Sequence, residues 1–130
     1  MGTKEIEQVL ITACSELGIV PVSRVFTPED YYDGVDERIV IHVKQQRRAP
    51  IFYRGFVEVN AVVPDIEGRQ NHRRVQEIEE ILCDAFRHDH VGDFSGETYR
   101  YGLESIQVLS EPDAHYHYVN ARLLFETLNI

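Results

Sequence analysis

Apolar residues recur at helical spacing in two segments of the chain. In the first, residues 3–17, Thr3 predicts the N-cap and Gly18 the end of the helix. In the second, Asn71 predicts the N-cap, and His88, His90 and Gly92 mark the end. The two apolar stripes, spaced three and four residues apart, are Ile6, Val9, Leu10, Ala13 and Leu17, and Val75, Ile78, Leu82, Ala85 and Phe86. The chain therefore carries two amphipathic helices, and the outer side of the second is acidic.

Other segments alternate apolar and polar residues, which is the period of a β-strand. The predicted strands are 21–26, 38–44, 51–63, 98–109 and a last strand that contains 119–126. The connections that we predict between them are an acidic loop over 28–37, the linker QQRRAP over 45–50, a turn over 64–68, a loop over 93–96 and a turn over 111–114. Strands 38–44 and 51–63 are expected to form a hairpin.

Two details of this alternation predict side-chain placement. The apolar parity shifts between Leu103 and Ile106, which predicts a β-bulge near Glu104 and Ser105. The last strand is expected to bury Val119, Ala121, Leu123 and Phe125 and to expose Asn120, Arg122 and Glu126.

The predicted element order is α-β-β-β-α-β-β. Because the strands are clustered rather than alternating with helices, the pattern favours an α+β fold with a mainly antiparallel sheet and both helices packed on one face. A length of 130 residues, with no internal repeat or linker, predicts a single domain over 1–130. Apolar residues make up 43% of the chain, enough for one core.

Charge and composition narrow the classes of partner. The formal net charge of −9 repels phosphate backbones and anionic lipid, so no sequence-specific nucleic acid and no membrane partner is expected. The first residues, MGTKEIEQ, are polar and no apolar run of signal-peptide length follows, which predicts synthesis in the cytoplasm. Cys14 and Cys83 both fall in the predicted helices and are expected to be reduced, structural thiols.

Catalytic and metal-binding motifs are not recognisable in the sequence. It contains no phosphate-binding GxxxxGK[ST], no GxGxxG and no GxSxG, so we expect no enzymatic activity and no cofactor. His115 and His117 could share a metal on one strand face, but two imidazoles supply only half of a zinc site, and we expect no metal. His88 and His90 are expected to interact with the C-terminus of the second helix.

Aromatic and charged residues give the candidate interface. Tyrosine and phenylalanine near strand ends are typical of contact surfaces, and Phe52 and Phe56 lie on the strand face opposite Tyr53 and Val57. Acidic side chains on the 28–37 loop and basic ones in QQRRAP are complementary charges for a contact between subunits. The predicted interface residues are Tyr31, Tyr32, Asp30, Asp33, Asp36, Arg47, Arg48, Phe52 and Phe56.

The whole chain resembles a family of small bacteriophage proteins. The segments TKEIEQVLITACSELG, ERIVIHV, FVEVNAVVPD, HRRVQEIEEILCDAF and HYVNARLLFET, in this order and spacing, resemble the tail-completion proteins of long-tailed phages, which join heads to tails or terminate the tail tube. The resemblance implies a non-enzymatic subunit of a ring, commonly a hexamer, between head connector and tail tube, located in the virion after assembly. The long PEDYYDGVDE and QQRRAP segments depart from the family pattern, so they leave the assembly contacts open.

Two other classes of function remain open from the sequence. A small acidic α+β domain also suits a monomeric or dimeric binding module, such as an immunity or adaptor protein. The third class is a small metal- or histidine-dependent enzyme that uses the histidine pairs.

Overall fold

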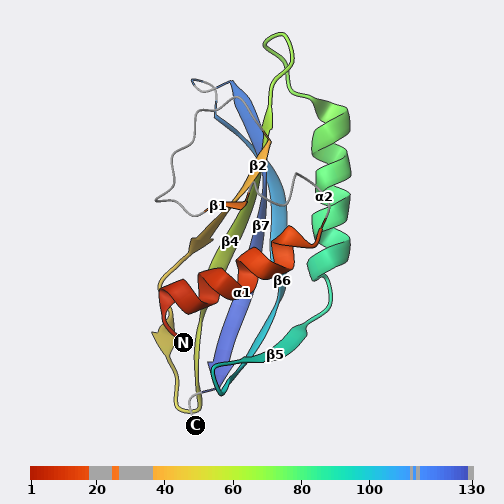
Figure 1. Ribbon diagram of the computed structural model, residues 1–130. Helices are drawn as coiled ribbons and strands as arrows, with labels where there is room; N and C mark the ends of the chain where they lie inside the picture. The colour runs from red at the N-terminus through yellow and green to blue at the C-terminus, as the bar shows by residue number, and fades with distance from the viewer. Residues whose placement is uncertain (18–24, 27–36, 112, 114, 129–130) are drawn as a thin grey trace.

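The computed structural model describes residues 1–17, 25–26, 37–111, 113 and 115–128, and within them two helices lie against one curled sheet (Figure 1). The helices are α1 Thr3–Ser15 and α2 His72–Phe86. The strands are β1 Val25–Phe26, β2 Arg38–Val43, β3 Arg47–Arg48, β4 Phe52–Pro64, β5 His90–Phe94, β6 Glu97–Glu111 and β7 Tyr116–Leu128. The predicted α+β class and the order α-β-β-β-α-β-β are confirmed by α1, β1, β2, β4, α2, β6 and β7, and the short strands β3 and β5 add to them.

The sheet has the order β1-β2-β4-β7-β6-β5, and β3 pairs with one end of β4. The pairs β2–β4, β4–β7, β7–β6 and β6–β5 are antiparallel, and only the pair β1–β2 is parallel among the described strands. The predicted hairpin is therefore confirmed by β2 and β4. The long strands β4 and β7 pair along their whole length and form the centre of the sheet.

The two helices begin differently. Asn71 caps α2 as predicted, since its side-chain oxygen accepts a hydrogen bond from the backbone N–H of Arg74 at 3.3 Å. The prediction that Thr3 caps α1 was wrong: Thr3 is already helical, and the extended Gly2 is the N-cap. The reason is that the first helical hydrogen bond runs from the N–H of Ile6 to the carbonyl of Gly2, one residue earlier than expected. Neither described helix is long and apolar enough to cross a membrane.

The core lies between the helices and one face of the sheet. Side chains from α1 and α2 share a single buried cluster with the apolar sides of β2, β4 and β7, which confirms that both helices pack on the same face. Its largest completely buried members are Phe86, Phe125, Ile6, Leu10, Ile39, Ile41, Ile78, Leu82 and Leu123. In Figure 1, α1 crosses the sheet while α2 runs beside β7 and β6.

Both cysteines lie in helices, as the sequence predicts, but in different surroundings. Cys14 on α1 is 3% exposed within the core, and burial raises the pKa of its thiol from 9.0 to about 12. Cys83 on α2 is partly exposed.

The short strands replace two predicted loops. The 93–96 segment is not a loop throughout: Phe94 pairs with Glu97, and Ser95 and Gly96 form a two-residue turn with φ of 50° and 84°. Two consecutive positive φ values are the signature of a tight hairpin turn, and this turn aligns β5 with β6. Similarly, QQRRAP does not fully break the sheet, because Arg47–Arg48 pairs with the start of β4.

The later strands confirm one side-chain prediction and correct another. The pairing of β6 with β7 shifts register between Leu103 and Ser105, which is the predicted bulge. Asn120 was expected to be exposed, but it is only 5% exposed. It is buried because it lies in the middle of the sheet, opposite Asn60 of β4 and Gln107 of β6, and its side chain donates a 2.6 Å hydrogen bond to Asn60.

Candidate functional site

The face of the sheet that the described helices leave uncovered is the candidate site, and we call it the open face. Along β4 the side chains Val57, Val59 and Ala61 point into the core, so Phe56, Glu58 and Asn60 point to the open face. The open face is therefore polar and charged, with a phenylalanine among its charges.

Side chains on the open face meet across neighbouring strands. Glu58 of β4 lies opposite His42 of β2 and Arg122 of β7. The guanidinium of Arg122 stacks over the ring of Phe56, with its central carbon 3.7 Å from the ring centroid. This cation–π contact fixes a positive charge above an aromatic surface.

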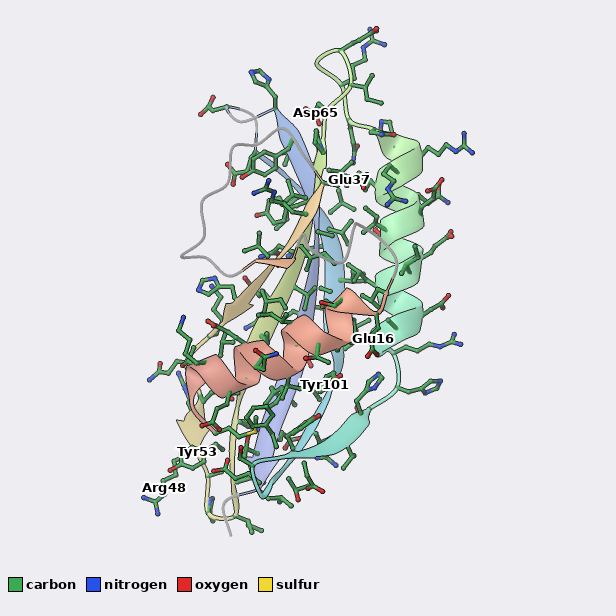
Figure 2. The ribbon with its side chains drawn as sticks, viewed as in Figure 1. Glu16, Glu37, Arg48, Tyr53, Asp65 and Tyr101 are labelled. Carbon is green, nitrogen blue, oxygen red and sulfur yellow. The ribbon has the colours of Figure 1, made fainter. Side chains whose placement is uncertain are left out.

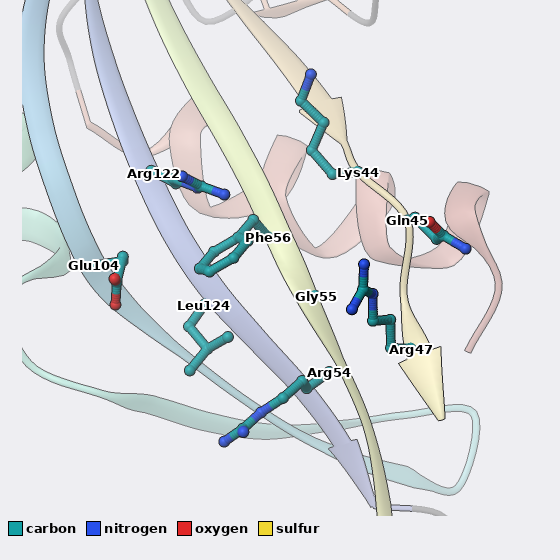
Figure 3. Close-up of a pocket in the computed structure, with 9 residues that line it drawn as sticks. All are labelled: Lys44, Gln45, Arg47, Arg54, Gly55, Phe56, Glu104, Arg122 and Leu124. Atoms are coloured by element: carbon teal, nitrogen blue, oxygen red, sulfur yellow. The ribbon is translucent and has the colours of Figure 1, made fainter. Parts of the chain in front are cut away.

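A basic pocket of about 540 Å³ opens at this point (Figure 3). Figure 3 shows it on the side of the sheet away from α1. Its walls carry four basic side chains and one acidic one, in a chain whose net charge is −9. The lining residues are Lys44, Gln45, Arg47, Arg54, Gly55, Phe56, Glu104, Arg122 and Leu124. The pocket is thus a local positive area on a chain that is negative overall.

Two arginines of the basic pocket occupy directly opposed positions. Arg47 of β3 pairs with Arg54 of β4, and residues opposite each other on neighbouring strands point to the same side. Like charges in this arrangement destabilise a sheet. Arg54 is partly neutralised by Glu126, whose carboxylate lies 3.4 Å away, and the same carboxylate accepts a 2.7 Å hydrogen bond from Arg100. That hydrogen bond raises the pKa of Arg100 above its usual value.

Gly55 allows the segment that connects β2 to β3 to approach β4 closely beside the basic pocket. A Cβ atom at this position would lie 2.5 Å from the backbone oxygen of Gln45 and 2.5 Å from the side-chain nitrogen of Gln46. A backbone atom cannot swing away as a flexible side chain can, so the segment that carries Arg47 depends on glycine here.

Replacing Gly55 with valine is expected to lower the free energy of unfolding by about 1–3 kcal/mol, because the new side chain overlaps Gln45 and Gln46. The change should also move Arg47 away from Arg54. Urea denaturation measures the loss of stability, and amide chemical shifts over residues 44–50 measure the displacement. Gly68→Ala is the contrasting variant, since a Cβ there meets nothing within 4 Å and only its positive φ of 75° opposes the change. Unaltered shifts over 44–50 in Gly55→Val would contradict the expected displacement.

An apolar end adjoins the basic pocket on the open face. Phe52, Val91 and Leu128 line a second hollow of about 260 Å³ together with Arg100 and Glu126. Val91 is 70% exposed and Leu128 is 42% exposed, so this end of the surface presents aliphatic side chains to solvent. A shallow hollow shared by Arg54, Arg100 and Glu126 joins this apolar end to the basic pocket. Together they form one continuous surface that is apolar at one end and cationic at the other.

The predicted interface residues are distributed unequally over this surface. Phe56 and Arg47 line the basic pocket, and Phe52 lies at the apolar end. Arg48 pairs with Tyr53 and belongs to the opposite side of the sheet; Figure 2 shows both side chains near the same end of the molecule. The predicted members Tyr31, Tyr32, Asp30, Asp33 and Asp36 lie outside the described residues.

The sequence analysis missed three cationic side chains of the basic pocket. Lys44, Arg54 and Arg122 are far apart in the chain, and only the pairing of β2, β4 and β7 brings them together. One signal in the sequence could have identified Arg54: it lies between Phe52 and Phe56 at alternate positions of β4, and so on the same face of the strand.

The histidines take part in local contacts. The Nε2 atom of His90 lies 2.8 Å from the carbonyl oxygen of Ala85, which confirms for His90 the predicted interaction with the end of α2. The Nδ1 atom of His117 lies 2.7 Å from a carboxylate oxygen of Asp65, and this contact joins the start of β7 to the end of β4. Within the described ranges, no group of three or more His, Cys, Asp or Glu side chains is arranged to hold a metal ion.

Comparison with known proteins supports the fold and leaves the function open. The sequence matches no protein-family model and no curated protein sequence. One solved structure superposes on 100% of this chain and 97% of its own with a TM-score of 0.64, at 15% sequence identity. At that identity the likeness shows that the two chains share a fold over their whole length.

Proposed function

We propose that this chain is a structural protein of a tailed bacteriophage or prophage, which forms a ring that joins the head connector to the tail or terminates the tail tube. The proposal is supported by the resemblance of the chain to tail-completion proteins in the order and spacing of its elements. Helices α1 and α2 and strands β2, β4 and β7 overlap the segments that carry this resemblance, and β6 lies between two of them.

The observation that carries the proposal is the continuous surface on the open face. Exposed Val91 and Leu128 form an apolar area next to several arginines, which is the composition of a protein–protein contact. Arginine and aromatic side chains dominate the binding energy of such contacts, and the pair Arg122 and Phe56 supplies both.

The edges of the sheet support assembly as well. In the described chain, β5 is paired on one side only, by β6, so its outer edge carries backbone groups without a strand partner. An edge of this kind must be covered, interrupted by charge or paired with another chain. Neighbouring subunits of a ring would cover it.

The proposal is tested by deleting the gene from an inducible prophage and examining the particles by electron microscopy. We expect separate DNA-filled heads and tails, or tails of uncontrolled length, and a loss of infectious particles. A plasmid copy of the intact gene should restore whole virions, which excludes effects on neighbouring genes. Normal infectious virions from the deletion strain would eliminate the joining and terminating roles and would favour the binding-module class.

A further inference from the structure

We propose that the basic pocket receives the acidic outer face of α2 from a second copy of this chain. The inference rests on the proposed ring and deepens it, since it names the two surfaces that meet. The outer face of α2 is defined here by Glu77, Glu80 and Asp84, which follow one another at helical spacing on the side away from the core.

Within the described residues, nearby carboxylates balance only part of the positive charge of the basic pocket. Lys44 reaches Glu58 at 3.6 Å and Arg54 reaches Glu126 at 3.4 Å, both long ion pairs between partly exposed groups. Arg47 is exposed directly opposite Arg54, and among the described lining residues Glu104 alone carries a carboxylate. A carboxylate brought in by another molecule would relieve the repulsion between the two opposed arginines.

The outer face of α2 carries carboxylates, which are complementary to the positive charge of the basic pocket. The carboxylate of Glu77 is already shared by Arg73 and Arg74, at 3.4 and 3.1 Å. Glu80 is exposed, and the side chain of Asp84 is 74% exposed, with Arg87 at 3.8 Å as its one ion-pair partner in the described part of the chain. Glu80 and Asp84 lie one helical turn apart. Because both are exposed, a partner can reach their carboxylates.

The positions of the two surfaces suit a ring. The basic pocket lies on the open face, and α2 lies on the helix-covered face (Figures 1 and 3), so one subunit cannot bring its own two surfaces together. A contact between different surfaces of identical subunits is head-to-tail, and such contacts close into rings when the rotation between neighbours allows it. Exposed Val91 and Leu128 beside the pocket would supply the apolar part of this contact.

The test is a charge exchange between the two surfaces. The pocket variant is Gln45→Glu with Arg47→Glu, two exposed positions at the rim, and the helix variant is Glu80→Lys with Asp84→Lys. Each variant alone should associate at least about 10-fold more weakly than the natural chain, because like charges then face each other. An equal mixture should recover association, since each altered surface meets an opposite charge on the other variant. Sedimentation velocity and native mass spectrometry measure the species formed.

Matched controls carry the same charge changes elsewhere. Gln8→Glu with Arg69→Glu adds the negative charge of the pocket variant, and Glu16→Lys with Glu111→Lys adds the positive charge of the helix variant; all four positions are exposed. Both controls should associate as the natural chain does. Circular dichroism and thermal unfolding establish that every variant is folded.

The possible failures are distinguishable. If the natural chain associates and the mixture recovers nothing, the ring stands and the α2 contact is wrong. If only the pocket variant loses association, another acidic surface fills the pocket, and the inference is equally overturned. A short DNA duplex bound by the natural chain and released by the pocket variant, with association unchanged, would assign the pocket to nucleic acid. A natural chain that stays monomeric at about 1 mM overturns the inference, while the prophage deletion decides separately on the proposed function.

Discussion

Replacing Phe125 with alanine is expected to lower the free energy of unfolding by about 3–5 kcal/mol. Phe125 is completely buried on β7, the strand that joins the two halves of the sheet. Its ring stacks on those of Tyr99 and Tyr101, with centroids 5.6 and 5.8 Å away. Removing it leaves a cavity in the aromatic part of the core, which neighbouring strands held by long hydrogen-bonded ladders cannot close.

Guanidinium denaturation followed by circular dichroism measures this loss. Leu128→Ala on the same strand is the control, because that side chain is 42% exposed and should cost less than about 1 kcal/mol. An equal decrease in the free energy of unfolding of the two variants would contradict this prediction, because the buried aromatic ring would then stabilise the fold no more than an exposed side chain of β7.

Alkaline pH is expected to destabilise the protein by about 4 kcal/mol between pH 9 and pH 12 through Cys14 alone. Burial raises the pKa of its thiol from 9.0 to about 12. Below pH 9 the thiol is protonated in both the folded and the unfolded chain, so the full stability is present. Above pH 9 the unfolded chain releases the proton that the folded chain still holds, and stability falls by about 1.4 kcal/mol per pH unit until the folded thiol also ionises.

Tyr101 should add to this loss of stability at alkaline pH, over a narrower pH range than Cys14. Desolvation, with a smaller contribution from Tyr99, raises the pKa of its phenol from 10.0 to about 12, so its effect begins near pH 10. Urea denaturation at a series of pH values measures the slope. Cys14→Ala should flatten the curve between pH 9 and 10, and Tyr101→Phe should flatten it only above pH 10. A curve that is level from pH 8 to 12 in the natural chain would contradict both assignments.

The fold was predictable from local patterns where one side of an element is buried. Ile78, Leu82 and Phe86 recur at helical spacing because they meet the core, and the parity change between Leu103 and Ile106 located the bulge for the same reason. The short strands were not predictable in this way. Neither Arg47–Arg48 nor His90–Phe94 contributes a buried side chain, so no apolar period identifies them. Their pairing follows instead from the Ser95–Gly96 turn for β5 and from the close approach of the chain to Gly55 for β3.

The candidate site was predictable only in part because it is assembled across strands. Phe52 and Phe56 could be identified from the sequence because they lie on the polar side of an otherwise regular strand. Arg122 and Lys44 gave no such signal, since an exposed basic residue on a strand is ordinary by itself. The contact that Arg122 makes depends on the register of the strands. A shift of one residue between β4 and β7 would place Arg122 next to a different side chain and remove its contact with Phe56.

The bulge in β6 has an evolutionary consequence for the basic pocket. Leu103 pairs with Leu123 and Ser105 with Arg122, so Glu104 is an extra residue that the ladder does not need. Its carboxylate nevertheless lines the pocket as the single acidic group there. A deletion of one codon at Glu104 would restore a regular ladder, keep the core side chains in register and raise the charge of the pocket by one. The charge of the basic pocket can thus change by insertion or loss of one residue, without any substitution in the core.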